Sequence, residues 1–218
     1  MNPISTQNLE NLPDVNGLRK LLQSLAVLDL IICPEWEDRY YSYNSKWSED
    51  EEMGSMRNGC GDDFFALFNP SGCFFKGFAH EYPMSSWKTD EQKPWPGILD
   101  SVPEEFSEAK SEPAFSMDSI SFCIWRLYSD NSWSHGPVTF PDATDPDGSQ
   151  FLLECLDRSP NSYKKYAEEY FEIDVPITII EHVYNHLPIT NEIVSTLNSD
   201  ISLSDIKEDL IEVGYPIE

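Results

Sequence analysis

The stretch FFALFNPSGCFFKGF, residues 64–78, decides the fold of this chain. Its first five residues are apolar on both faces, as in the central strand of a sheet. Asn69-Pro70-Ser71-Gly72 then has the composition of a tight hairpin turn, and residues 73–78 form a second apolar run that returns. We therefore expect an antiparallel hairpin near the centre of a sheet.

The residues before this hairpin repeat with the period of two that is typical of strands. Tyr41, Tyr43 and Trp47 are predicted to share one face of a first strand. Residues 53–57 are predicted to form a second strand, and the acidic run 48–52 between them is interpreted as a turn or an exposed edge. Together, these segments and the hairpin predict an antiparallel β-meander.

The residues near the N-terminus repeat instead with the spacing of a helix. Leucines follow one another three or four residues apart, and further apolar residues up to Ile31 widen the stripe. Such a broad apolar surface predicts a helix that is covered on most sides, and Pro34 is expected to end it. The leucines of the stripe are Leu18, Leu21, Leu22, Leu25 and Leu28.

The residues after the hairpin change from strand to helix patterns. Residues 119–127 are predicted to form a further strand, and residues 129–148 a long loop with little periodicity. A helix is expected over 149–156, followed by a helical array in which Thr190 and Ser202 each cap a helix.

The whole pattern predicts an α+β fold, in which an antiparallel β-meander packs with an N-terminal helix and a C-terminal helical array. We expect a single domain over residues 1–218. A division into a helix-plus-sheet part over 1–128 and a helical subdomain over 149–218 stays open.

The charge balance excludes two classes of partner. The 218 residues include 39 acidic and 14 basic side chains, which gives a net charge of −25. A chain so poor in lysine and arginine does not bind nucleic-acid phosphates or an anionic membrane surface in general. Hydrophobic residues make up 40% of the chain, which is enough for a folded core. A basic protein is the partner that this balance favours.

The cysteines and the first residues indicate the compartment. Five cysteines are dispersed along the chain, an odd number, and residues 1–17 contain neither lysine, arginine nor an apolar block. We therefore expect reduced thiols and a cytoplasmic location. No nucleotide-binding loop, nucleophile elbow or Cys-x-x-Cys pair is found in the sequence, and no cofactor is expected.

Two groups of residues are candidates for metal binding. Asp145, Asp147 and Glu154 fall at positions 3, 5 and 12 of an EF-hand calcium loop, but Ala143 stands where the first ligand is needed. The alternative is an Asp-rich turn in which Asp147 caps a helix that begins at Ser149.

The second candidate group consists of two histidines. His182 and His186 are four residues apart on a predicted helix, which is the spacing of a two-histidine zinc face. Val183 follows the first histidine where a zinc protease has glutamate, so the general base of that mechanism is missing. The alternative is a solvated helix face.

A surface for a protein partner is indicated by aromatic residues among acidic ones. Five tryptophans lie in or beside predicted loops and strand ends: Trp36, Trp47, Trp87, Trp95 and Trp133. Aromatic anchors surrounded by one sign of charge suit an interface with a basic protein, and the alternative is that most of them are core residues. The residues predicted to contact the partner are Trp47, Glu49, Asp50, Glu51, Glu52, Asp62 and Asp63.

One segment carries a resemblance. The residues GSMRNGCGDDFF (54–65), continuing to GFAHE (77–81), resemble bacterial proteins of uncharacterised function. In size, acidity and α+β pattern the chain is also similar to intracellular immunity proteins that neutralise basic toxins. That similarity implies an inhibitor without catalytic residues.

The sequence thus predicts an acidic intracellular protein-binding protein, of the immunity or inhibitor type. One alternative is a calcium- or zinc-dependent protein or enzyme that uses the metal candidates above. Another is an inhibitor that mimics nucleic acid with its carboxylates. The oligomeric state is left open.

Overall fold

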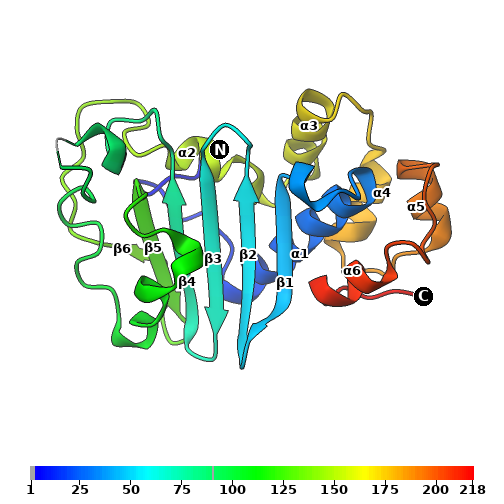
Figure 1. Cartoon of the computed structure of the whole chain (residues 1–218), viewed down its shortest axis with the longest axis horizontal. Coiled ribbons are helices and arrows are strands. Elements are labelled where there is room, and N and C mark those ends of the chain that lie inside the picture. Colours follow the sequence, from blue (N-terminus) through cyan, green and yellow to red (C-terminus); the bar gives the residue numbers. More distant parts are fainter. Residues whose placement is uncertain (1–2, 90) are drawn as a thin grey trace.

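The protein is built on one six-stranded antiparallel sheet with helices on one side (Figure 1). This computed structural model describes residues 3–89 and 91–218. The strands follow one another in chain order, so the predicted α+β meander is confirmed; the strand expected over 119–127 is β5, and β6 is not among the predicted strands. They are β1 (Tyr41–Ser48), β2 (Glu51–Arg57), β3 (Asp63–Asn69), β4 (Gly72–Phe78), β5 (Phe122–Leu127) and β6 (Ser134–His135).

Within the described residues, one α-helix precedes the sheet and five follow its fifth and sixth strands, together with several short 3-10 turns, among them η1 (Trp36–Asp38). None of the helices in the described ranges has the length and apolar character needed to cross a membrane. The helices are α1 (Val15–Ile32), α2 (Ser149–Leu152), α3 (Pro160–Tyr170), α4 (Ile177–Tyr184), α5 (Asn191–Leu197) and α6 (Lys207–Val213).

The hairpin of β3 and β4 is closed by its predicted turn. The Asn69 side-chain oxygen accepts hydrogen bonds from the backbone N–H groups of Ser71 and Gly72, at 2.9 and 3.1 Å. A Cβ atom at Gly72 would lie 2.2 Å from the carbonyl oxygen of Arg126 on β5. Glycine is therefore needed here because the next strand passes close to the turn.

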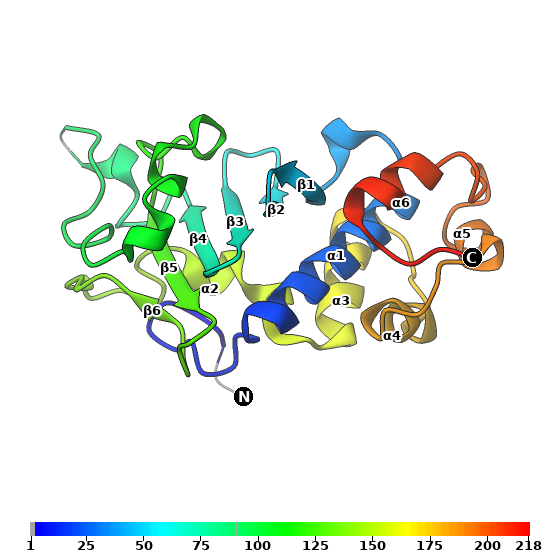
Figure 2. The same ribbon diagram turned by 90° about the horizontal axis from the view of Figure 1, so that it is seen from below.

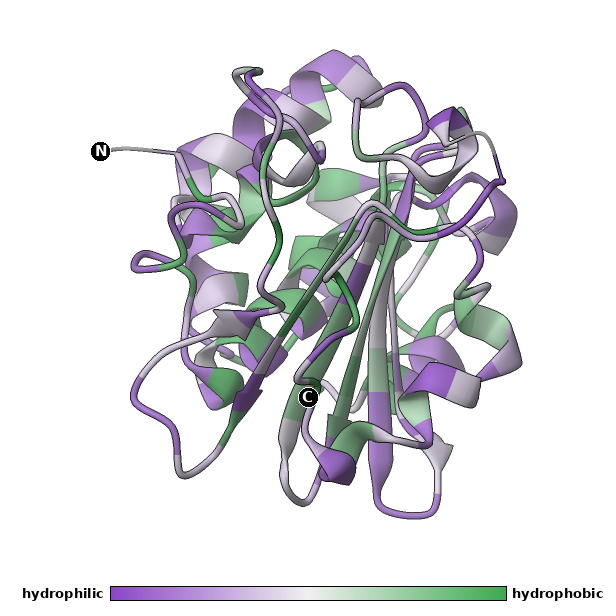
Figure 3. Ribbon diagram, turned by 90° about the vertical axis from the view of Figure 1, so that its left-hand side faces the viewer, coloured by the Kyte–Doolittle hydropathy of each residue, from purple (hydrophilic) through white to green (hydrophobic). Residues whose placement is uncertain are grey.

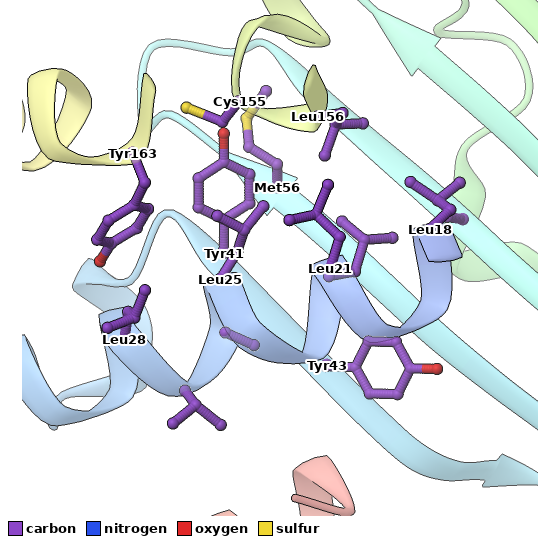
Figure 4. Packing of buried hydrophobic residues seen from close by; sticks show 14 of the residues in the cluster. Leu18, Leu21, Leu25, Leu28, Tyr41, Tyr43, Met56, Cys155, Leu156 and Tyr163 are labelled. Atoms are coloured by element: carbon purple, nitrogen blue, oxygen red, sulfur yellow. The ribbon is translucent and has the colours of Figure 1, made fainter. Parts of the chain in front are cut away.

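Helix α1 is the centre of the larger core. Every residue from Leu21 to Ile31 is buried, as the broad apolar stripe predicts. Its leucines pack against Tyr41, Tyr43 and Met56 of the sheet and against Leu156 and Tyr163 beyond it (Figure 4). The helix crosses beneath the sheet, and α3, α4 and α6 surround its second half (Figure 2).

The opposite face of the sheet has a smaller core of its own. Residues 84–89 and 91–121, mostly irregular with short 3-10 turns, fold over β3, β4 and β5, and Phe106 is buried there with Phe74 and Trp125 of the sheet. Apolar residues accordingly concentrate in the strands between the two layers, and the outer loops are hydrophilic (Figure 3). This second layer does not extend over all of β1 and β2, which lie uncovered between it and α6 (Figure 1).

One strand prediction is wrong because of a bulge. Tyr41 and Tyr43 face α1 as expected, but Trp47 packs with the core on the opposite face. Between Asn44 and Ser48 the pairing of β1 with β2 shifts by two residues, and this irregularity interrupts the alternation of side chains on which the prediction for Trp47 depended.

Two helix predictions also need correction. The helix expected over 149–156 is divided into α2 and a 3-10 turn at Glu154–Asp157. Ser202 does not cap a helix, because its hydroxyl donates to Asp205 and α6 starts only at Lys207. Thr190 does cap α5, since its hydroxyl oxygen accepts from the backbone N–H of Ile193 at 3.2 Å.

A buried carboxylate ties the two layers of the larger core together. Asp29 of α1 is fully buried, and it accepts hydrogen bonds from the hydroxyls of Tyr163 and Tyr166 on α3 and from the backbone N–H of Tyr41 on β1. Burial raises its pKa to about 7 in spite of these hydrogen bonds. In the unfolded chain the carboxyl has its ordinary pKa near 3.8.

We predict that Asp29 makes the protein less stable as the pH rises. Because the pKa is higher in the folded chain, the folded state keeps a proton that the unfolded state releases, and this contribution to stability is complete below about pH 4 and lost towards about pH 7. Between about pH 5 and about pH 8, the free energy of unfolding should fall by about 3 kcal/mol more in the parent chain than in Asp29→Asn. Urea denaturation of both proteins at each pH measures the difference, and equal slopes would contradict the prediction.

Candidate functional site

The seven residues predicted to contact a partner do not form one patch. Glu49 to Glu52 lie at the β1–β2 hairpin, whereas Asp62 and Asp63 lie where β3 begins. Since Glu52 pairs with Phe68 and Arg57 with Asp63, the two groups are separated by the length of β2, about 17 Å at the usual rise of a strand.

Asp62 and Asp63 are engaged inside the protein. Asp62 is only 8% exposed, and its carboxylate accepts from the backbone N–H of His80 and from the side-chain amide of Asn58. Its Oδ1 also lies 2.6 Å from the Nδ1 atom of His80. Asp63 forms an ion pair of 2.8 Å with Lys76, which is completely buried. These two carboxylates therefore hold the β2–β3 turn and β4 in place.

Two of the hairpin acids are also engaged, and two are exposed. Glu52 pairs with Arg19 at 2.9 Å and accepts from the hydroxyl of Tyr43 at 2.7 Å. Glu51 accepts from the hydroxyl of Ser48. Glu49 and Asp50 are exposed at the tip of the hairpin. Only this tip keeps the accessibility that the predicted contact patch requires.

The calcium-loop candidates act mainly as helix caps. Asp147 is buried, and accepts from the backbone N–H of Ser149 and from the hydroxyl of Thr6. Asp145 accepts from the backbone N–H groups of Gln150 and Phe151, at 3.1 and 3.2 Å. Glu154 instead points to Lys165, with which it forms an ion pair. The structure thus shows an Asp-rich turn before α2, but the N-cap residue is Gly148 and not Asp147 as the alternative predicted.

The two histidines bind different backbone carbonyls. His182 Nε2 lies 2.9 Å from the oxygen of Pro188, and His186 Nε2 lies 2.8 Å from the oxygen of Lys20. Helix α4 ends at Tyr184, so His186 lies beyond it with a positive φ of 53° and not on the expected helix face. Across residues 3–89 and 91–218, no three histidine, cysteine or acidic side chains are placed to hold a metal ion.

The predicted tryptophans divide between surface and core. Trp36 and Trp87 are 53% and 55% exposed, and Trp47 and Trp95 are half-buried. Trp133 is a core residue whose indole N–H donates to the carbonyl of Pro13.

A groove lies where the sheet is uncovered, and two of these tryptophans line it. It encloses about 290 Å³ over β1 and β2, beside α6. Trp36 of η1 and Trp47 of β1 are aromatic walls, and Ser42 and Ser55 are on its floor. We call this cavity the open-face groove; Ala26, Arg39, Tyr41, Tyr43, Asn44, Met53, Asp209, Glu212 and Val213 complete its lining.

Carboxylates flank the open-face groove on two sides. Arg39 is largely satisfied within the wall, since it pairs with Asp209 at 2.9 Å and donates to the carbonyls of Cys33 and Pro34. The Arg57 guanidinium lies 4.0 Å from the centre of the Trp36 ring. Lys207 at the start of α6 is the third cation of this region. Six carboxylates lie in or beside η1 and α6, and they are Glu35, Glu37, Asp38, Glu208, Asp209 and Glu212.

Sequence reasoning found part of this groove and missed the rest. Trp36 and Trp47 stand out as candidate anchors because they neighbour acidic residues. Nothing in the sequence places α6 beside β1, so Asp209 and Glu212 could not be grouped with them. Comparison with known proteins identifies no relative, because no family model matches the chain and no curated protein or solved structure is significantly similar to it.

The Lys76–Asp63 pair supports a prediction about stability. Burial lowers the pKa of Lys76 and raises the pKa of Asp63, so for both groups the cost of desolvation exceeds the gain from their attraction. Asp63→Asn should lower the free energy of unfolding by about 3 kcal/mol, because it leaves a buried cation without a partner.

The double variant Asp63→Asn/Lys76→Met is the matched control. It removes both charges and keeps an unbranched side chain in the core, so its stability should return to within about 1 kcal/mol of the parent chain. Denaturation in urea measures both variants. A double variant as unstable as the single one would show that the ion pair itself stabilises the sheet.

Proposed function

We propose that this protein binds a basic segment of another protein in the open-face groove and acts as an inhibitor of that partner. The observation that carries the proposal is the groove itself, where Trp36 and Trp47 stand on an uncovered part of the sheet between acidic flanks. Exposed aromatic side chains supply contact energy at protein interfaces, and carboxylates around them favour a basic partner.

The rest of the surface supports attraction of such a partner. Within the described ranges, seven of the 14 lysines and arginines are in ion pairs with carboxylates of the same chain. Their positive charge is therefore neutralised locally, and the excess of acidic groups dominates the surrounding field. A field of one sign accelerates the encounter with an oppositely charged protein.

The contact of Arg57 with Trp36 supports the chemistry of the anchor. A guanidinium over an indole ring is the best case of a cation–π contact, and this indole remains 53% exposed. The inhibitory role is proposed from the similarity in size, acidity and α+β pattern to immunity proteins that neutralise basic toxins.

The two exposed tryptophans provide a test of the anchor. With a synthetic lysine-rich peptide as the probe, Trp36→Ala should raise the dissociation constant about tenfold, because a buried aromatic contact is lost. Trp87→Ala removes an equally exposed indole outside the groove and should change the constant less than about twofold. Isothermal titration calorimetry measures both. Equal losses in the two variants would place the binding elsewhere.

The acidic residues provide an independent test. Glu208→Gln/Glu212→Gln removes two charges beside the groove, and Glu49→Gln/Asp50→Asn removes two exposed charges at the β1–β2 hairpin. At low ionic strength the first pair should weaken peptide binding about fivefold, and the second pair by less than about twofold. If the hairpin variant weakens binding as much, the field of the whole protein and not the groove holds the peptide.

A further inference from the structure

Arg57 is a cation without a hydrogen-bond acceptor in a protein that is rich in acceptors. Its guanidinium stacks on Trp36, and among residues 3–89 and 91–218 it forms no ion pair and no side-chain hydrogen bond. Its neighbour in the β2–β3 register is Asp63, whose Oδ1 lies 2.8 Å from Lys76 Nζ. The nearest carboxylate in the sheet is therefore committed to another cation.

A second polar group, which belongs to a residue of the groove lining, also lacks a hydrogen-bond partner. The hydroxyl oxygen of Ser42 is buried and has no hydrogen-bond partner in the described part of the chain. Ser42 pairs with Ser55 across β1 and β2, and Ser55 precedes Arg57 by two residues, so the three side chains lie on one face of the sheet. Arg57 is not part of the groove lining itself, but its contact with Trp36 places its guanidinium at the Trp36 corner, on the same side of the sheet as the buried Ser42 hydroxyl.

We infer that this corner of the groove binds a carboxylate, supplied by an aspartate or glutamate within the basic segment that the groove takes. The inference rests on the proposed function and adds a specific contact to it. A guanidinium fork offers two parallel N–H donors to a carboxylate, and stacking on Trp36 fixes the plane of the fork.

The electrostatic surroundings make such a contact selective. Burial lowers the pKa of Arg57, and the nearby Asp63 carboxylate offsets only part of this effect. The acidic flanks of the groove repel a carboxylate, so an acidic side chain in the occupant is most favourable next to the Arg57 guanidinium. One such residue would set the register of the segment along the groove.

Two matched lysine-rich peptides test the inference. They differ only in a central glutamate or glutamine, and calorimetry at an ionic strength of about 0.01 M, where charges are weakly screened, gives both dissociation constants. The glutamate peptide should bind about tenfold more tightly although its net positive charge is lower, as expected for one charge-assisted bidentate contact.

Two variants of Arg57 separate the fork from its charge. In Arg57→Gln the ratio of the two constants should fall from about ten to one or below, because only repulsion of the glutamate remains. In Arg57→Lys, which keeps the charge but loses the fork and the stacking, the ratio should be about three. Thermal melting checks that both variants remain folded; the backbone N–H of residue 57 still donates to the carbonyl of Tyr40.

The possible results distinguish this inference from the proposed function. If both peptides bind but the parent chain does not prefer glutamate, the inference is overturned and the proposed function stands. A preference that persists in Arg57→Gln also overturns the inference, because another residue then supplies the donors. If neither peptide binds at low ionic strength, the proposed function fails and the inference fails with it.

Discussion

The rest of the structure depends on the burial of α1 on every side between Leu21 and Ile31. A helix without a polar face needs cover opposite the sheet as well as from the sheet. The C-terminal helices provide it, and α3, α4 and α6 all contact either α1 or the strand that it covers. Because these helices pack around α1, the opposite face of the sheet is covered only by the irregular segment over β3 to β5. The open-face groove over β1 and β2 is the consequence.

Buried charges connect this packing to the chemistry of the surface. Asp29 and Lys76 are both fully buried, one satisfied by tyrosine hydroxyls and the other by a single carboxylate. Asp62 and Asp63, which read as surface acids in the sequence, are part of the same internal framework. A net charge of −25 therefore overstates what a partner meets at the β2–β3 turn, and the accessible negative charge lies elsewhere, beside the groove and at the hairpin tip.

Local patterns in the sequence predicted most helices and strands. The positions of side chains that depend on contacts between distant segments could not be predicted in this way. The stripe of leucines predicts α1, and the Asn69–Gly72 turn predicts the central hairpin, because both depend on nearest neighbours. Trp47 is misplaced because a bulge changes the period within β1. The metal candidates fail to assemble because their spacing also suits capping. The sequence could not predict the groove, because α6, which supplies one of its walls, is more than 150 residues away from η1 and β1, which supply the others.

At such a surface, different residues attract a basic segment and distinguish one basic segment from another. A field of one sign draws in any basic segment and distinguishes poorly between them. Selection between basic segments needs a group that binds one chemical feature of the segment and is left unpaired when that feature is missing. A cation surrounded by carboxylates is such a group, and the feature is an acidic side chain. Arg57 could have been neutralised by Asp63, but Lys76 binds that carboxylate, and Trp36 holds the guanidinium open at the groove. The buried Lys76–Asp63 pair, on the same face of the sheet as Arg57, thereby leaves the Arg57 charge without a carboxylate partner beside the groove.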